Sequence, residues 1–295
     1  MSDLGLEGVL RRDRLVTAAA LAVIVILAWA YVVWFASAMS IPMPAGAPPA
    51  GTDPGMSMDM DMPGMKMDMP GMDMSAPATD TVGSPAIASW SAPEFAFVAS
   101  MWIAMMVGMM TPSAAPLILL YARVGRSAAA QGKPFAPSAW FVGGYLIAWS
   151  IFAVAATGAQ WLFEQALLIS PMMGPASRLV GGIILIVAGL YQWTPFKDAC
   201  LGQCRAPLDF IQQNGGFQRR AAGSLRLGIL HGVYCIGCCW ALMGLLFVGG
   251  IMNPLWIAGI VVLVLVEKLV PAIRWIPRTA GVALVVAGVW FLVSP

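Results

Sequence analysis

The chain has 295 residues, of which 60% are hydrophobic and only 10% are charged, and its mean hydropathy is +0.81. Soluble domains carry a charge on about a quarter of their residues, so this composition predicts an all-α, polytopic membrane protein. The formal net charge of +2 is too small to indicate a nucleic-acid partner.

The first apolar run covers residues 15–36 and follows three arginines between positions 11 and 14. Its length of about twenty residues and the aromatic side chains at its far end are typical of a spanning helix. The alternative is a signal peptide cleaved at the small residues 36–38, but the apolar core of a signal peptide is shorter. We therefore interpret residues 1–36 as an N-terminal transmembrane anchor.

Residues 37–93 are rich in Met, Pro, Gly, Asp and Ser, which predicts a disordered linker. The hexapeptide Met-Asp-Met-Pro-Gly-Met occurs twice in it, and its methionines are Met60, Met62, Met65, Met67, Met69 and Met72. Thioethers are soft ligands that select Cu(I), and the aspartates between them add oxygen ligands. We predict that this Met-rich linker gathers Cu(I); the alternative is a low-complexity spacer.

Six further apolar segments form a membrane domain over residues 94–295, at about 95–121, 138–160, 176–194, 227–249, 254–270 and 277–294. If the N-terminus is cytoplasmic, fourteen of the sixteen basic residues fall on the inner side, as the positive-inside rule requires. This pattern predicts seven transmembrane helices. The Met-rich linker then faces the extracytoplasmic space, and a loop over residues 195–226 faces the cytoplasm.

The segment from His231 to Met243 contains the only histidine and three of the five cysteines. Ionisable ligands are costly at membrane depth unless something pairs with them, so this segment marks a functional site. In a regular helix His231, Cys235, Cys239 and Met243 share one face, and Cys238 lies beside them. However, His231 and Cys239 lie about 12 Å apart along the axis, so a straight helix cannot place them all on one ion.

Two arrangements would complete such a site. Either Gly232 and Gly237 let the helix unwind, or another helix supplies the missing ligands. A low-coordinate site of the three cysteines suits Cu(I), whereas addition of His231 in an unwound segment gives a Cys3His zinc site. In the remaining alternative the cysteines are small buried hydrophobic residues without a ligand role.

A second stripe of soft ligands is formed by Met101, Met105 and Met109, which share a face of the second apolar segment. These side chains reach the same depth as the cysteines, so the two stripes can meet. Methionine is also a common filler of apolar cores, and packing alone is the alternative.

Glu267 lies near the inner end of the segment 254–270, at about the depth of His231. Its carboxylate could accept the spare imidazole N–H and orient the ring. The alternative is that Glu267 and Lys268 form a pair that reaches the inner interface.

The remaining cysteines, Cys200 and Cys204, are four residues apart in the predicted loop. We predict a cytoplasmic dithiol through which metal arrives or leaves. Ordinary loop cysteines are the alternative, because this spacing by itself is a weak signal.

Several motifs together resemble a known family, namely Tyr191–Lys197, Cys200-x3-Cys204, His231-Gly-x-Tyr-Cys-x-Gly-Cys-Cys-Trp and Glu267-Lys268. They are similar to the predicted metal-binding integral membrane proteins grouped as domain-of-unknown-function family 2182. The resemblance covers most of the chain from about residue 95 and implies metal binding in a membrane domain.

We therefore expect a multi-pass protein of the bacterial inner membrane that handles Cu(I). It would act as a transporter, or as an accessory that exchanges copper with a membrane or periplasmic cuproenzyme or a periplasmic metallochaperone. The chain has no nucleotide-binding motif, which argues against ATP-driven pumping. We therefore favour a metal-binding protein over an enzyme. The alternatives are a membrane thiol–disulfide oxidoreductase, and a subunit of a larger complex with zinc or another structural metal.

Overall fold

The computed structural model describes residues 3–39, 90–133, 135–166, 178–251, 253–270 and 275–294, and within these ranges all regular structure is helical. The Met-rich linker, including Met60, Met62, Met65, Met67, Met69 and Met72, lies outside the described residues. The helices are α1 (Asp3–Met39), α2 (Ala92–Ala130), α3 (Ser138–Gln165), α4 (Arg178–Tyr191), α5 (Pro195–Arg205), α6 (Pro207–Gln213), α7 (Ala221–Gly244), α8 (Leu246–Gly249), α9 (Pro254–Leu269) and α10 (Trp275–Val293).

Each of the seven apolar segments is helical, which confirms the all-α prediction for the described residues. Among the described residues, five helices are long and apolar enough to cross a membrane: α2, α3, α10, the apolar part of α1, and α7 with α8. Helices α4 and α5 together give a sixth candidate, bent by 66° at their junction. Helix α9 has 16 residues and is shorter than these candidates.

The structure differs from the predicted loop over residues 195–226, because this segment contains α5 and α6. The hydroxyl of Thr194 accepts a hydrogen bond from the backbone N–H of Lys197, and Pro195 occupies the first turn, where its missing N–H costs nothing. These two residues start α5 at the bend after α4. The bend brings the two cysteines of α5 against α7.

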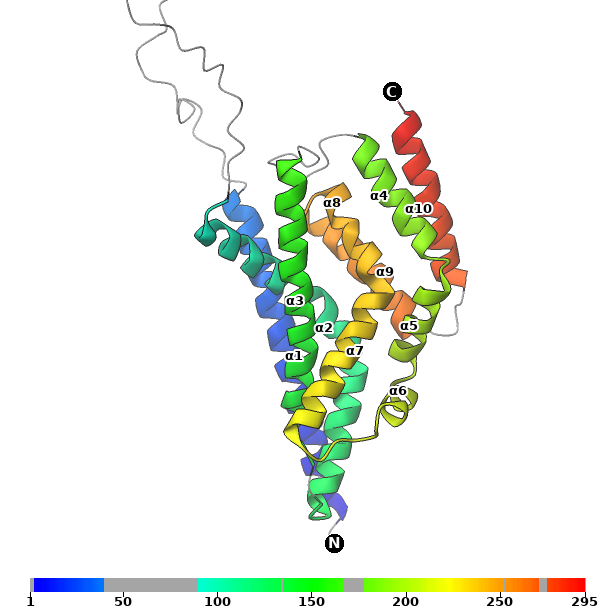
Figure 1. Cartoon of the computed structure of the whole chain (residues 1–295). Coiled ribbons are helices and arrows are strands. Elements are labelled where there is room, and N and C mark those ends of the chain that lie inside the picture. The colour runs from blue at the N-terminus through cyan, green and yellow to red at the C-terminus, as the bar shows by residue number, and fades with distance from the viewer. Residues whose placement is uncertain are drawn as a thin grey trace, which may run out of the picture. The chain divides into compact units, whose positions relative to one another are not determined.

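Helices α3 and α7 lie side by side along much of their length (Figure 1), and glycines allow their close approach. A Cβ atom at Gly144 of α3 would overlap the backbone of Leu225, and one at Gly228 of α7 would overlap that of Phe141. At a third glycine, Gly232, a Cβ atom would stand 2.5 Å from the Cβ atom of Ala148. Small residues spaced by four are the usual device for close helix packing in membranes.

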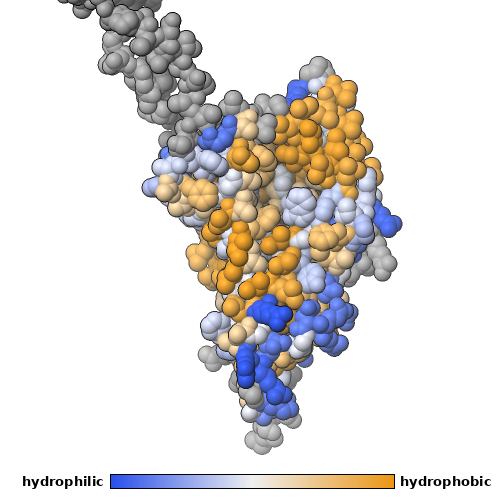
Figure 2. Space-filling view, in the orientation of Figure 1, coloured by the Kyte–Doolittle hydropathy of each residue, from blue (hydrophilic) through white to orange (hydrophobic). Residues whose placement is uncertain are grey.

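Hydrophobic residues cover the middle and upper part of the face in Figure 2, and hydrophilic residues gather at the lower end. Exposed large side chains include Ile151 at 66%, Leu255 at 85% and Trp290 at 72%. The lower end is where α2 ends and α7 begins in Figure 1. Such a continuous apolar surface is compatible with a lipid environment.

Candidate metal centre

The thiol of Cys235 is the hub of a buried polar network. The Nζ atom of Lys268 donates a hydrogen bond to its sulfur at 2.8 Å, and the hydroxyl of Tyr145 lies 3.2 Å from the same atom. All three residues are at most 5% exposed. An ammonium beside a sulfur atom is the kind of environment in which a thiolate is stabilised.

This network joins four helices. Besides contacting Cys235 on α7, Tyr145 of α3 donates to the carbonyl of Met110 on α2 at 2.9 Å. Lys268 of α9 reaches the hydroxyl of Ser113 on α2 at 3.3 Å, and this hydroxyl also donates to the Met110 carbonyl at 2.8 Å. The network therefore fixes the position of the Cys235 sulfur relative to α2, α3 and α9.

The other two thiols of α7 lie next to this hub. Cys238 and Cys239 donate to the backbone carbonyl of Cys235 at 3.1 and 3.0 Å. The sulfur of Cys239 is also 4.0 Å from the thioether sulfur of Met110. With metal–sulfur bonds of about 2.3 Å, two sulfurs on one trigonal ion stand about 4.0 Å apart. The spacing of Cys239 and Met110 therefore suits a shared, low-coordinate ion.

Helix α5 brings both of its cysteines to the same place. Cys204 lies near enough to the thiols of Cys235 and Cys238 to interact with them electrostatically. Cys200 packs on Gly237, where a Cβ atom would stand only 2.7 Å from its sulfur. All five cysteines are free thiols. The two cysteines expected in a separate loop thus lie on α5, which packs against α7, the helix of the other three. We call these five cysteines the thiol cluster.

The sequence suggested that Glu267 orients His231, but in the structure Glu267 has a different partner. Its carboxylate forms an ion pair with Lys197 of α5 at 2.7 Å, and Lys197 also donates to the side-chain oxygen of Gln192. Both charged residues are at most 2% exposed. An ammonium satisfies a buried carboxylate better than a neutral imidazole does, because it compensates the charge. The pair therefore holds α5 against α9, beside the thiol cluster.

His231 is buried among aromatic rings one helical turn before Cys235. Its ring centroid lies 5.7 Å from that of Tyr145, 6.0 Å from Phe141 and 5.1 Å from Phe210. Its Nδ1 atom is buried and has no hydrogen-bond partner among the described residues. A ring nitrogen is therefore available near the cluster, although no contact between His231 and a thiol is observed.

The predicted methionine stripe is buried, but most of it points away from the thiols. Met105 and Met109 line a small gap with Ala28 and Trp29 of α1, so this side of α2 faces the anchor helix. Met101 is buried as well. The residue that reaches the thiol cluster is Met110, next in the chain to the predicted Met109.

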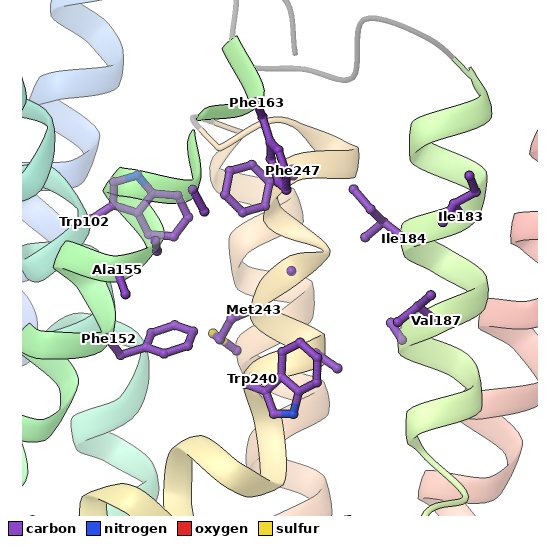
Figure 3. A pocket seen from close by; sticks show the side chains of 15 residues that line it. Trp102, Phe152, Ala155, Phe163, Ile183, Ile184, Val187, Trp240, Met243 and Phe247 are labelled. Atoms are coloured by element: carbon purple, nitrogen blue, oxygen red, sulfur yellow. The ribbon is translucent and has the colours of Figure 1, made fainter. Parts of the chain in front are cut away.

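Met243, one turn beyond Cys239, lines an apolar cavity of about 360 Å³. Figure 3 shows its side chain between those of α3 and α4, near Phe152 and Trp240. Tryptophan, phenylalanine, isoleucine, valine, alanine and glycine residues form the rest of the lining. The stripe on α7 therefore divides, with Cys235 and Cys239 in the polar network and Met243 in an apolar cavity.

The arrangement favours one of the two ways to complete the site. Helix α7 is continuous from Ala221 to Gly244, so neither Gly232 nor Gly237 unwinds it. Other helices instead bring Met110 and Cys204 to the thiols. Over the described ranges, no group of three His, Cys, Asp or Glu side chains is arranged to hold a metal ion. A four-coordinate zinc site is thus not supported, whereas two or three sulfur ligands suffice for Cu(I).

The sequence reasoning missed Tyr145, Ser113 and Met110, and it interpreted Lys268 only as an interface residue. One signal could have singled out both Lys197 and Lys268. Both are charged residues next to apolar segments, and a buried charge needs a partner of opposite or ionisable character. Tyr145 and Ser113 carried no signal, since hydroxyl side chains are common in membrane helices.

These features place sulfur atoms of α2 and α7 close together in a helical bundle, and sulfur atoms are the ligands that soft metal ions prefer. A protein-family model described as PpoB2, copper chaperone, matches residues 99–291, which is more than half of the chain. The chain belongs to this family. The match supports a copper-handling accessory role and begins after the Met-rich linker. No curated protein and no solved structure matches the chain.

Proposed function

We propose that this protein is a membrane-embedded Cu(I) chaperone whose thiol cluster, together with Met110, carries the ion. The observation that supports this most is the convergence of sulfur ligands from α2, α5 and α7 in a chain of the copper chaperone family. Thiolates and thioethers are the ligands that select Cu(I) among biological metals.

The proposed setting is the bacterial inner membrane, with seven spans and a cytoplasmic N-terminus. Lys197 and Lys268 are buried beside the cluster, and without them twelve basic residues remain on the predicted inner side, against two on the outer. The positive-inside rule still supports this orientation. Figure 1 shows α1 beginning and α10 ending at opposite ends of the bundle, which an odd number of crossings requires.

In the proposed route the Met-rich linker gathers Cu(I) outside, and the ion passes to Cys239 and Met110. From there, exchange of one sulfur ligand at a time moves it toward Cys235, Cys238 and Cys204. The ion then reaches a cuproenzyme or another carrier. Each step replaces one metal–sulfur bond by another, so the ion keeps sulfur ligands within the apolar bundle.

The test is Cu(I) binding by the full chain purified in detergent under reducing conditions. X-ray absorption should show sulfur ligands at low coordination number in the wild type. Replacement of Cys235, Cys238 and Cys239 by Ser should abolish this site. A chain without residues 40–89 should keep the site and lose only additional Cu(I) bound by the linker. Unchanged stoichiometry and unchanged spectra in the triple variant would refute the assignment.

The proximity of Cys204 to Cys238 also favours one alternative, a thiol–disulfide exchange protein. That activity requires a thiol that a substrate can reach, and Cys235, Cys238 and Cys239 are each about 1% exposed. Mixed disulfides trapped in cells by a Cys204→Ser variant would support this alternative, and their absence would favour the copper proposal.

A further inference from the structure

Lys268 carries a buried charge that faces thiols instead of a carboxylate. Its Nζ atom contacts the sulfur of Cys235 at 2.8 Å and the hydroxyl of Ser113 at 3.3 Å. The neighbouring carboxylate, Glu267, is already paired with Lys197 at 2.7 Å. Within the part of the chain that the structure describes, no carboxylate pairs with Lys268. A buried positive charge of this kind needs negative charge in its surroundings.

The sulfur of Cys235, 2.8 Å from the Nζ atom, is positioned to supply that charge as a thiolate. Besides Cys235, the thiols of Cys238, Cys239 and Cys204 lie within its electrostatic range. The ammonium is 5% exposed, so water screens it little. Any ion bound by these thiols is therefore bound beside a fixed positive charge that comes from α9.

We propose that Lys268 is a specificity-determining residue that makes the thiol cluster prefer a monovalent soft ion over a divalent one. The inference rests on the proposed Cu(I) function and concerns the charge of the ion. Two thiolates and one ammonium leave a single negative charge, which one monovalent ion neutralises. A divalent ion at the same two thiolates leaves a net positive charge in an apolar environment, which is unfavourable.

A third thiolate could balance a divalent ion, but the geometry does not offer it readily. No three His, Cys, Asp or Glu side chains of the described residues are grouped as a metal-binding set. One sulfur pair with a spacing suited to a shared ion joins a thiol to an uncharged thioether, Cys239 and Met110 at 4.0 Å. A thioether adds a soft ligand without adding charge, which again suits a monovalent ion.

The test compares Ag(I), a soft monovalent ion that is not readily oxidised, with Cd(II), a soft divalent ion that binds thiolates. The full chain in detergent is titrated with each ion and with both in competition. Lys268→Gln and Lys268→Leu remove the charge, Lys268→Arg keeps it, and Lys133→Gln removes a charge from an exposed lysine outside the helices. Size-exclusion profile and helix content establish that each variant is folded.

The charge-removing variants should lose at least a factor of about ten in the preference for Ag(I) over Cd(II), because one unit of repulsion disappears within a few ångströms. Lys268→Arg and Lys133→Gln should keep the wild-type preference. A second kind of variant keeps Lys268 and places a carboxylate beside it. Ser113→Asp, at a position 3.3 Å from the ammonium, should reduce the preference in the same direction.

The outcomes separate this inference from the proposed function. If the wild type binds Ag(I) through its thiols and folded Lys268→Gln, Lys268→Leu and Ser113→Asp keep its preference, the role of Lys268 is refuted and the copper proposal stands. If the wild type binds no Ag(I) through its thiols, both are refuted. A loss of preference in the Lys268 variants and in Ser113→Asp supports both.

Discussion

The ion pair between Lys197 and Glu267 should be a main support of the metal centre, and its rupture should be strongly destabilising. The 2.7 Å contact joins α5 to α9, and the two side chains are 0% and 2% exposed. Arg205, the last residue of α5, adds a hydrogen bond to the backbone carbonyl of Glu267 at 2.8 Å. Replacement of Lys197 by Met leaves a buried carboxylate without its cation, which typically costs about 3–5 kcal/mol.

The measurement is a double-mutant cycle. Thermal unfolding in detergent is followed by intrinsic fluorescence for the wild type, Lys197→Met, Glu267→Gln and the double variant. Each single variant should lower the melting temperature clearly, and the double variant should recover much of the loss, because a neutral pair of similar volume removes the uncompensated charge. Lys133→Met, at an exposed position, is the control and should have little effect.

The cycle should also affect the metal centre, because α5 carries Cys200 and Cys204. Alkylation of free thiols in the folded chain should be faster in Lys197→Met than in the wild type, since a loosened α5 exposes its cysteines. Additive effects of the two substitutions, or single variants as stable as the wild type, would refute the idea that this pair holds α5 in place.

Three further expectations test the geometry of the cluster. Gly237→Ala places a Cβ atom 2.7 Å from a sulfur of α5 and should lower both the melting temperature and Cu(I) affinity, whereas Gly244→Ala, with no atom within 4 Å, should do neither. Met110→Leu should weaken Cu(I) binding about tenfold or more with little loss of stability, and Met109→Leu, on the side facing α1, should leave binding unchanged; equal effects would contradict the assignment of Met110. Deletion of the Met-rich linker should slow loading at low Cu(I) concentration without changing the ligands seen by X-ray absorption.

Hydropathy was sufficient to predict the helical segments, because each long apolar run must satisfy its backbone hydrogen bonds internally. It was insufficient for α5, a short helix that contains Lys197, Asp198 and Arg205 and therefore has no apolar signature. The local signal for this helix is Thr194 followed by Pro195, a capping residue and a first-turn proline. This signal indicates where α5 begins, but it does not predict the 66° angle between α4 and α5.

Within the site, helical periodicity predicted that Cys235 and Cys239 share one face of α7, and both side chains are buried in the structure. It could not decide between neighbours on the partner helices. Adjacent residues in a helix differ in direction by roughly 100°, so Met109 and Met110 point to different neighbours, as do Glu267 and Lys268. In both pairs the sequence reasoning chose the first residue and the structure brings the second to the thiols. The rotation of a helix about its axis is set by packing, which a single sequence does not reveal.

The number of sulfur ligands bears on what the bound ion is for. A structural metal site has as many ligands as the ion coordinates and closes around it. Here the five thiols and Met110 are distributed over α2, α5 and α7 and, among the described residues, are not grouped around one point, so an ion would use only some of them at a time. Surplus ligands of the same chemistry let the ion exchange one sulfur for another without leaving the apolar interior. We infer that such a surplus fits transfer of the ion better than permanent retention, which favours a chaperone over a subunit with a structural metal.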